Sequence, residues 1–253
     1  ILVLLSFAAA VLILHQRKLA QQPVLLATLL LMLLFWQGLL GKWTVTLRLH
    51  PLVVMSHLLG GFALLSVLWL LLLRLKPFHI PACTSQEEKL RPWAILGLLF
   101  IILQISLGGW TSANYAAFVC TDFPMCQGQW WPPMNFSAGF HLSFNAEQNY
   151  EGGVLSTTAR TAIQMSHRLG ALITTSYLAC LIYKLFGTRQ GSLLRRIGLI
   201  LLLLLIIQIS LGALNVLWAL PLLIAMAHNA VAALLLLSLI TLNIYLTLDK
   251  GKI

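Results

Sequence analysis

Charge is scarce in this sequence. Only 9% of its 253 residues are charged and six are Asp or Glu, whereas 60% are hydrophobic and the mean hydropathy is +0.92. A soluble domain has about a quarter of its residues charged. Apolar spans containing Leu199–Ile207 and Val231–Ile240 are long enough to cross a bilayer, which needs about 20 residues. The composition therefore excludes an ordinary soluble domain and predicts an all-α polytopic membrane protein.

The motifs of several soluble enzyme classes are also absent. The sequence contains no phosphate-binding loop, no zinc-protease motif and no Ser-His-Asp set. The net charge of +10 does not form a patch for nucleic acid, because the basic residues lie in short segments between apolar spans. Twelve of the 16 Lys and Arg fall in 17–18, 74–91, 184–196 and 250–252. The positive-inside rule places these segments in the cytoplasm and the 112–158 loop outside.

Seven apolar segments are expected to be helices, the first of them too short to cross a membrane. They are 1–14, 23–45, 52–73, 93–111, 160–185, 194–216 and 221–248. We interpret 1–76 as an incomplete N-terminal helical half and 77–92 as a cytoplasmic linker. Residues 93–253 are then a C-terminal four-helix half, which includes the outer loop 112–158. The predicted architecture is two four-helix bundles in tandem.

An internal repeat supports the tandem bundles. Gln37-Gly-Leu-Leu-Gly-Lys-Trp-Thr-Val precedes His57 by twenty residues, and Gln208-Ile-Ser-Leu-Gly-Ala-Leu-Asn-Val precedes His228 by twenty. Gln104-Ile-Ser-Leu-Gly-Gly-Trp-Thr opens the pattern a third time, although its histidine, His167, follows only after the long loop. Parallel repeats of this kind relate the halves of a membrane protein by an axis along the membrane normal.

Three histidines lie at similar depth in these spans. At 1.5 Å per residue, His57, His167 and His228 each lie roughly 10 Å below the outer surface. Ionisable residues inside a membrane are costly and mark functional sites. The same spacing places a fourth histidine before Ile1, and the first helix is short. We therefore expect the chain to be truncated inside a membrane helix, with no signal peptide to explain its start.

Two histidines at one depth on facing helices can bind a haem iron from both sides. For His167 and His228 the shared depth favours ligation over a structural role. Arg168 suits a haem propionate, with Lys42 and Arg48 as weaker counterparts in the first half. A snorkelling arginine at the membrane interface is the alternative for Arg168.

Glycines and methionines lie near the histidines. A set of glycines would admit a flat cofactor or serve helix packing alone: Gly60, Gly61, Gly108, Gly109, Gly170 and Gly212. Methionines precede each histidine by two residues at Met55, Met165 and Met226. We expect them to fill the core, with ligation of a haem iron as the alternative.

Two cysteines in the outer loop, Cys120 and Cys126, suggest a short disulfide in an oxidising compartment. A metal pair or free thiols are the alternatives. Cys83 lies on the cytoplasmic side and Cys180 within a helix, so neither is an expected partner.

Four motifs together resemble the bacterial haem A synthases of the CtaA type. They are Gly108-Gly-Trp-Thr, Asn114-Tyr115-Ala-Ala, Cys120-Thr-Asp-Phe-Pro-Met-Cys126-Gln-Gly-Gln-Trp-Trp-Pro-Pro133 and His167-Arg168-Leu-Gly-Ala. The resemblance covers essentially the whole chain. It implies eight helices in two halves and oxidation of a methyl of haem O to the formyl of haem A, for cytochrome c oxidase biogenesis in the bacterial inner membrane.

The resemblance also implies roles for single residues. His167 and His228 correspond to ligands of haem b in the C-terminal half. His57 corresponds to a ligand of the substrate haem O, whose partner histidine and functional carboxylate would precede Ile1. Cys120 and Cys126 correspond to a disulfide. Haem O synthase and an electron donor are the expected partners, and the 112–158 loop is expected in the periplasm with the C-terminus in the cytoplasm.

Two other classes compete with this interpretation. A non-enzymatic b-type membrane cytochrome, passing electrons from quinol, fits the composition and the histidine depths equally well. The repeats alone suggest a transporter, but the spans lack the broken helices and buried acids of that class. Only the outer-loop motif and the tandem halves favour the enzyme over the cytochrome.

Overall fold

The computed structural model describes residues 2–16, 22–75, 84–142, 145, 147–189 and 192–247. Regular structure in these ranges is helical, apart from an isolated antiparallel bridge between Cys126 and Gln129. Within the same ranges, six helices are long and apolar enough to cross a membrane. The prediction of an all-α, multi-pass membrane protein is therefore confirmed. The chain divides into two compact units, 1–80 with 144–151, and 81–143 with 152–253.

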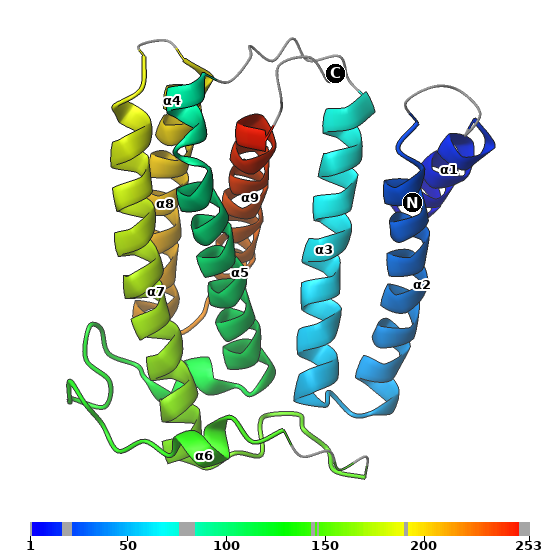
Figure 1. Ribbon diagram of the computed structural model, residues 1–253. Helices are drawn as coiled ribbons and strands as arrows, with labels where there is room; N and C mark the ends of the chain where they lie inside the picture. The colour runs from blue at the N-terminus through cyan, green and yellow to red at the C-terminus, as the bar shows by residue number, and fades with distance from the viewer. Residues whose placement is uncertain are drawn as a thin grey trace. The chain divides into compact units, whose positions relative to one another are not determined.

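The first unit contains three helices: α1 (Leu2–His15), α2 (Val24–Thr46) and α3 (Pro51–Leu75). Helix α2 packs against both α1 and α3 (Figure 1). The buried core of the first unit consists of small and aliphatic side chains from all three helices, namely Ala10, Ile13, Ala27, Leu30 and Leu71. The predicted spans 1–14, 23–45 and 52–73 match these helices to within two residues.

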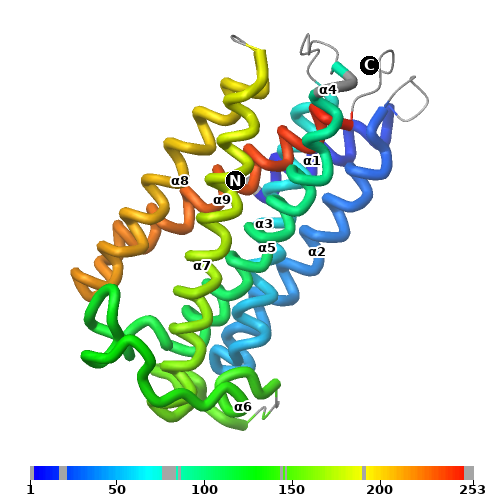
Figure 2. The backbone as a smooth tube through the Cα atoms, turned by 60° about the vertical axis from the view of Figure 1, so that its left-hand side comes forward, coloured from blue at the N-terminus to red at the C-terminus, as the bar shows by residue number. Residues whose placement is uncertain are grey.

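The second unit is a ring of four long helices: α5 (Arg91–Ala113), α7 (Thr157–Phe186), α8 (Leu193–Leu217) and α9 (Leu222–Thr247). Helix α5 packs on α7 and α9, and α8 packs on the same two helices, so α7 and α9 occupy opposite corners (Figure 2). Fully buried leucines fill the centre, among them Leu178, Leu181, Leu201, Leu235 and Leu239.

Short elements complete this unit. They are α4 (Ser85–Glu88), the 3-10 helix η1 (Ala116–Val119) and α6 (Phe136–Gly139). Both η1 and α6 pack against α7. The indole nitrogen of Trp110 on α5 donates a hydrogen bond of 2.9 Å to the carbonyl of Gly139 in α6. This bond attaches the outer segment to the bundle.

The three helices that carry the repeated glutamines end in the same way. Eleven residues after each glutamine comes a non-glycine residue with positive φ: Arg48, Tyr115 and Ala219, at 47°, 54° and 55°. In α2 and α8 the next residue is also left-handed, and its N–H bonds to the carbonyl five residues back, a Schellman arrangement. The repeat seen in the sequence is therefore also a repeat of backbone conformation.

One domain assignment needs correction. The sequence placed the whole loop 112–158 in the C-terminal half, but 144–151 groups with the first unit. The reason is local. The N–H of Tyr150 donates to the carbonyl of Arg48, and its ring meets the ring of His50 edge-on at 4.8 Å. Arg48 in turn donates from Nη1 to the carbonyl of Glu147 at 3.0 Å.

Several residues used in the topology prediction lie outside the described ranges. These are Arg17, Lys18, Lys76, Cys83 and the tail 249–252. The assignment of sides to the loops therefore stays a prediction.

Candidate haem-ligand site

His167 lies on α7 and packs against α5. The amide nitrogen of Gln104 on α5 lies 3.0 Å from Nδ1 of His167 and donates to the His167 carbonyl oxygen, also at 3.0 Å. Gly108, one turn further along α5, lies directly against the imidazole, because a Cβ there would come within 3.1 Å of Cε1. The ring is thus held at one nitrogen and packed on its Cε1 edge. Nε2 is the ring nitrogen that Gln104 does not engage.

His228 on α9 has the same kind of neighbours on α8. The amide nitrogen of Gln208 lies 3.2 Å from Nε2 of His228. A Cβ at Gly212 would come within 3.2 Å of the Cε1 atom of the ring. The Nδ1 atom of His228 is buried without a hydrogen-bond partner. Here the glutamine approaches the other ring nitrogen, and one imidazole nitrogen is left unsatisfied.

The bundle places these two histidines on opposite corners, ten residues from the start of α7 and six from the start of α9. Imidazoles from two helices of a bundle are a donor set that a haem iron accepts. Unsatisfied buried nitrogen is normally rare in proteins, so the Nδ1 atom of His228 indicates a missing partner. Within the described ranges no three His, Cys, Asp or Glu side chains gather around a common point. A bis-imidazole haem site needs only two, and the residues present fit it.

His57 in the first unit has a related setting on α3. A Cβ at Gly41 of α2 would lie 3.4 Å from Cε1 of His57. Nδ1 of His57 and the amide nitrogen of Gln37 are both buried without a hydrogen-bond partner. Gln37 instead lies against Gly60, where an added Cβ would overlap its amide nitrogen. The glycine and glutamine of the repeat are thus present, but the glutamine does not reach the ring.

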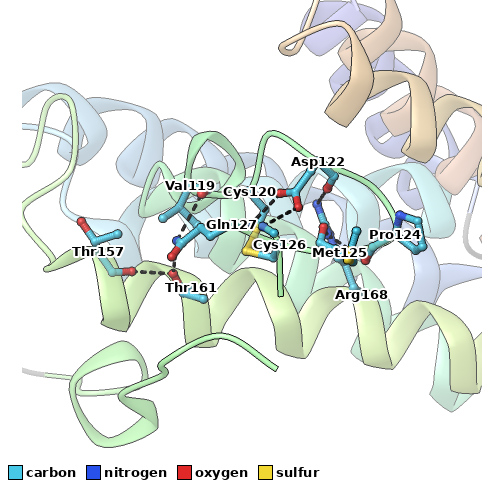
Figure 3. The surroundings of a disulfide bond; sticks show 11 residues. Val119, Cys120, Asp122, Pro124, Met125, Cys126, Gln127, Thr157, Thr161 and Arg168 are labelled. Atoms are coloured by element: carbon cyan, nitrogen blue, oxygen red, sulfur yellow. Dashed lines mark hydrogen bonds between the residues drawn. A yellow bond between two sulfur atoms is a disulfide. The ribbon is translucent and has the colours of Figure 1, made fainter. Parts of the chain in front are cut away.

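Arg168 follows His167 and points to the loop that contains Cys120 and Cys126, called here the disulfide loop (Figure 3). Its guanidinium donates to the carbonyl oxygens of Met125 at 2.7 Å, Asp122 at 3.0 Å and Pro124 at 3.4 Å. Its Nε is buried without a hydrogen-bond partner. The side chain therefore does not snorkel freely into solvent. It fixes the loop through both Nη atoms and retains one free buried N–H donor.

Cys120 and Cys126 form a disulfide, with their Cα atoms 4.7 Å apart (Figure 3). The carboxylate of Asp122 accepts hydrogen bonds within the loop from the N–H groups of Gln127 at 2.7 Å and Gly128 at 2.8 Å. These bonds, that from Gly128 above all, hold the pKa of the Asp122 carboxyl below its ordinary value. Cys180 is a free, exposed cysteine.

The loop contacts three successive turns of α7. Gln127 donates to the hydroxyl of Thr161 at 3.1 Å, and Met165 is buried against both cysteines. Arg168 provides the third contact. Residues 161, 165 and 168 lie on one helix face. The disulfide loop therefore covers α7 beside His167, and Met165 has a core role, as expected. The same expectation is wrong for Met226, whose side chain is exposed.

Comparison with known proteins identifies the family of this chain. The family model described as cytochrome oxidase assembly protein, COX15-CtaA, matches residues 1–240. The chain belongs to the COX15-CtaA family. It is 47% identical over 229 residues to the heme A synthase of Shewanella oneidensis, covering 90% of this chain and 68% of that protein. It is 28% and 26% identical to the heme A synthases of Neorickettsia sennetsu and Caulobacter vibrioides, covering 79% of this chain in each case.

This COX15-CtaA chain spans about two thirds of the length of the Shewanella protein and somewhat over half of the other two, at 57% and 56%. The family expectation from the outer-loop and His-Arg motifs is therefore confirmed. The assignment of particular residues to haem stays a prediction.

Sequence reasoning missed the side chains that hold the histidines. In the sequence Gln104 and Gln208 only mark the repeat, yet in the structure each reaches an imidazole nitrogen. The signal was present in the spacing, because each glutamine lies one turn before the glycine on which the ring packs. Residues four apart lie on the same helix face, so the glutamine and the glycine contact the same neighbouring histidine.

Proposed function

We propose that this chain is a haem A synthase, which oxidises the methyl group of haem O to the formyl group of haem A for cytochrome c oxidase biogenesis. The pair His167 and His228, each packed on a glycine, would provide haem ligands in an enzyme and in a cytochrome alike. The observation that carries the proposal is the Cys120–Cys126 loop, whose motif resembles that of the haem A synthases and which contacts α7 beside His167. The heme A synthases of Shewanella oneidensis and Neorickettsia sennetsu, to which the chain is similar, support the same activity.

The two histidines of the second unit would hold haem b. Held by two imidazoles, the haem would supply electron transfer. The haem supplies the redox chemistry, and the protein supplies ligation, orientation and exclusion of water. Arg168 is the proposed propionate partner through its buried, unpartnered Nε, since guanidinium suits carboxylate.

His57 would be one ligand of the substrate, haem O, in the first unit. Its Nδ1 is buried without a partner, and its Cε1 edge packs near Gly41. Arg48, the corresponding propionate candidate, is engaged with the carbonyl of Glu147 through Nη1. We assign propionate binding to Arg168, because its Nε is buried without a partner, whereas the Arg48 side chain is exposed.

We further propose the bacterial inner membrane as the location, with the 112–158 loop in the periplasm and the C-terminus in the cytoplasm. A disulfide loop suits the oxidising side of that membrane. The expected partners are haem O and haem A, the synthase that supplies haem O, and an electron donor.

The test is the pigment that co-purifies with the full chain when it is produced in cells that make haem O. Haem A, or haem O hydroxylated on its methyl group, beside haem B supports the proposal. Haem B alone, in protein supplied with haem O, would contradict it and favour a non-enzymatic b-type cytochrome. Replacing His57 with Ala is the matched comparison, since it should abolish conversion and keep the haem b spectrum.

A further inference from the structure

The pattern Gln-x-x-x-Gly occurs on three helices, α2, α5 and α8, each time facing a histidine on the following long helix. Its three copies are Gln37/Gly41 with His57, Gln104/Gly108 with His167 and Gln208/Gly212 with His228. The glycine always lies against Cε1 of the ring, at 3.4, 3.1 and 3.2 Å from an added Cβ. A glycine that served only helix packing would not meet the same ring atom three times.

The glutamine has its own place beside the histidine. On α7, Gly170 lies one turn after His167, and a Cβ there would come within 2.5 Å of the Oε1 atom of Gln104. Gly60 has the same relation to His57 and Gln37. Only a residue without a side chain leaves room for the amide at this point. On α9 the corresponding residue is Val231, and there the glutamine reaches Nε2 instead of Nδ1.

The contacts of Gln104 are specific for the Nδ1 side of the ring. The amide lies 3.0 Å from Nδ1 of His167 and 3.0 Å from the carbonyl of the same residue. An amide offers a donor at one atom and an acceptor at the other, and the two are interchanged by a half-turn of the group. As placed, the amide nitrogen of Gln104 donates to the His167 carbonyl and to Nδ1. The Oε1 atom of Gln104 is buried without a partner, and the half-turn would bring it to Nδ1, where it would accept a hydrogen bond from the N–H of a histidine whose Nε2 binds iron.

A metal-bound histidine normally gives its second N–H to a fixed acceptor, which sets the tautomer and ring orientation and raises its basicity as a ligand. We propose that Gln104 is the positioning residue of His167: it holds Nδ1, so that Nε2 is the atom presented to the haem iron, and it tunes that iron through the hydrogen bond. This inference rests on the proposed haem site. Gln208, which meets the other nitrogen of His228, is not assigned this role.

The experiment uses the full chain, purified without haem and titrated with haemin, and then poised electrochemically. Gln104→Ala should weaken haem binding roughly 10–100-fold, the usual cost of removing such a partner. It should also raise the reduction potential, because a less basic imidazole stabilises ferric iron less. Gln104→Glu, a stronger acceptor, should move the potential in the opposite direction. Ser106→Ala is the control, since that exposed hydroxyl bonds only to its own helix at Ile102.

A second variant keeps the test independent of how the first one folds. Gly170→Ala leaves both Gln104 and His167 in place but pushes the amide aside. It should shift the potential in the same direction as Gln104→Ala and add nothing in the double variant, as coupled residues do. If Gln104 had a purely structural role, its replacement would lower thermal stability, and the reduction potential would not move in opposite directions in Gln104→Ala and Gln104→Glu.

The two proposals fail in different ways. If the wild-type chain binds no bis-imidazole haem, the proposed function and this inference both fall. If it binds one, and Gln104→Ala matches Ser106→Ala in affinity and in potential, only the positioning role of Gln104 is overturned.

Discussion

Removing the disulfide between Cys120 and Cys126 should release the outer loop from α7. The bond joins cysteines six positions apart, and closing a ring of about seven residues restricts the open chain by about 2.4 kcal/mol at 25 °C. That free energy corresponds to about a 50-fold increase in the open population of the loop. Replacing both cysteines with Ser should therefore loosen the contacts made at Arg168 and Thr161.

Amide hydrogen exchange measures this opening directly. The N–H groups of Gln127 and Gly128, which donate to Asp122, should exchange about 50-fold faster in the double Ser variant. Cys180→Ser, at a free and exposed cysteine, is the control and should leave both rates unchanged. Exchange at the wild-type rate in the double variant would refute the reasoning, because the loop would then be held by its hydrogen bonds alone.

Three further outcomes are expected. The pKa of Asp122 is lowered in the folded loop, so its carboxylate stabilises the loop fully above about pH 4, and this contribution is lost as the pH falls below that value. Amide exchange of the loop, corrected for intrinsic rates, should show this loss of stability, and Asp122→Asn should remove its pH dependence. Gly108→Ala should displace the His167 ring by a few tenths of an ångström and reduce haem retained through gel filtration. Trp110→Phe should leave the Gly139 carbonyl unpaired and destabilise the bundle by roughly 1–3 kcal/mol in thermal unfolding.

Each of these has a simple contradicting result. If amide exchange in the loop has the same pH dependence with Asn as with Asp at position 122, the carboxylate does not stabilise the loop. Equal haem retention in Gly108→Ala and in Gly61→Ala, where an added Cβ meets nothing within 4 Å, would mean that the ring is not packed tightly. An unfolding temperature unchanged by Trp110→Phe would show that the Gly139 carbonyl finds another donor.

Helix positions followed from the sequence because apolar runs alone determine what crosses a bilayer. Their ends did not. The predicted span 160–185 begins three residues late, because Ser156 caps α7 through a bond to the N–H of Ala159. Ser192 likewise extends α8 by one residue through the N–H of Arg195. Polar caps of this kind are invisible to a hydropathy pattern.

The histidines of the candidate site were recognisable from charge and depth, whereas their surroundings were not. Burial of a polar group demands a partner, but the sequence does not say which helix face supplies it. Gln104 lies 63 residues before His167, so only the packing of α5 on α7 brings them together. The same holds for Arg168, whose carbonyl partners depend on the folded path of the disulfide loop.

The central claim is that His167 and His228 bind one haem from opposite sides, and the reduced absorption and ferric EPR spectra of two single Ala variants test it most directly. The account predicts that the wild-type chain shows a low-spin bis-imidazole haem b and that each variant loses it. The two losses should be alike, because removing either ligand breaks the same site. A low-spin signal that persists unchanged in both variants would contradict the account.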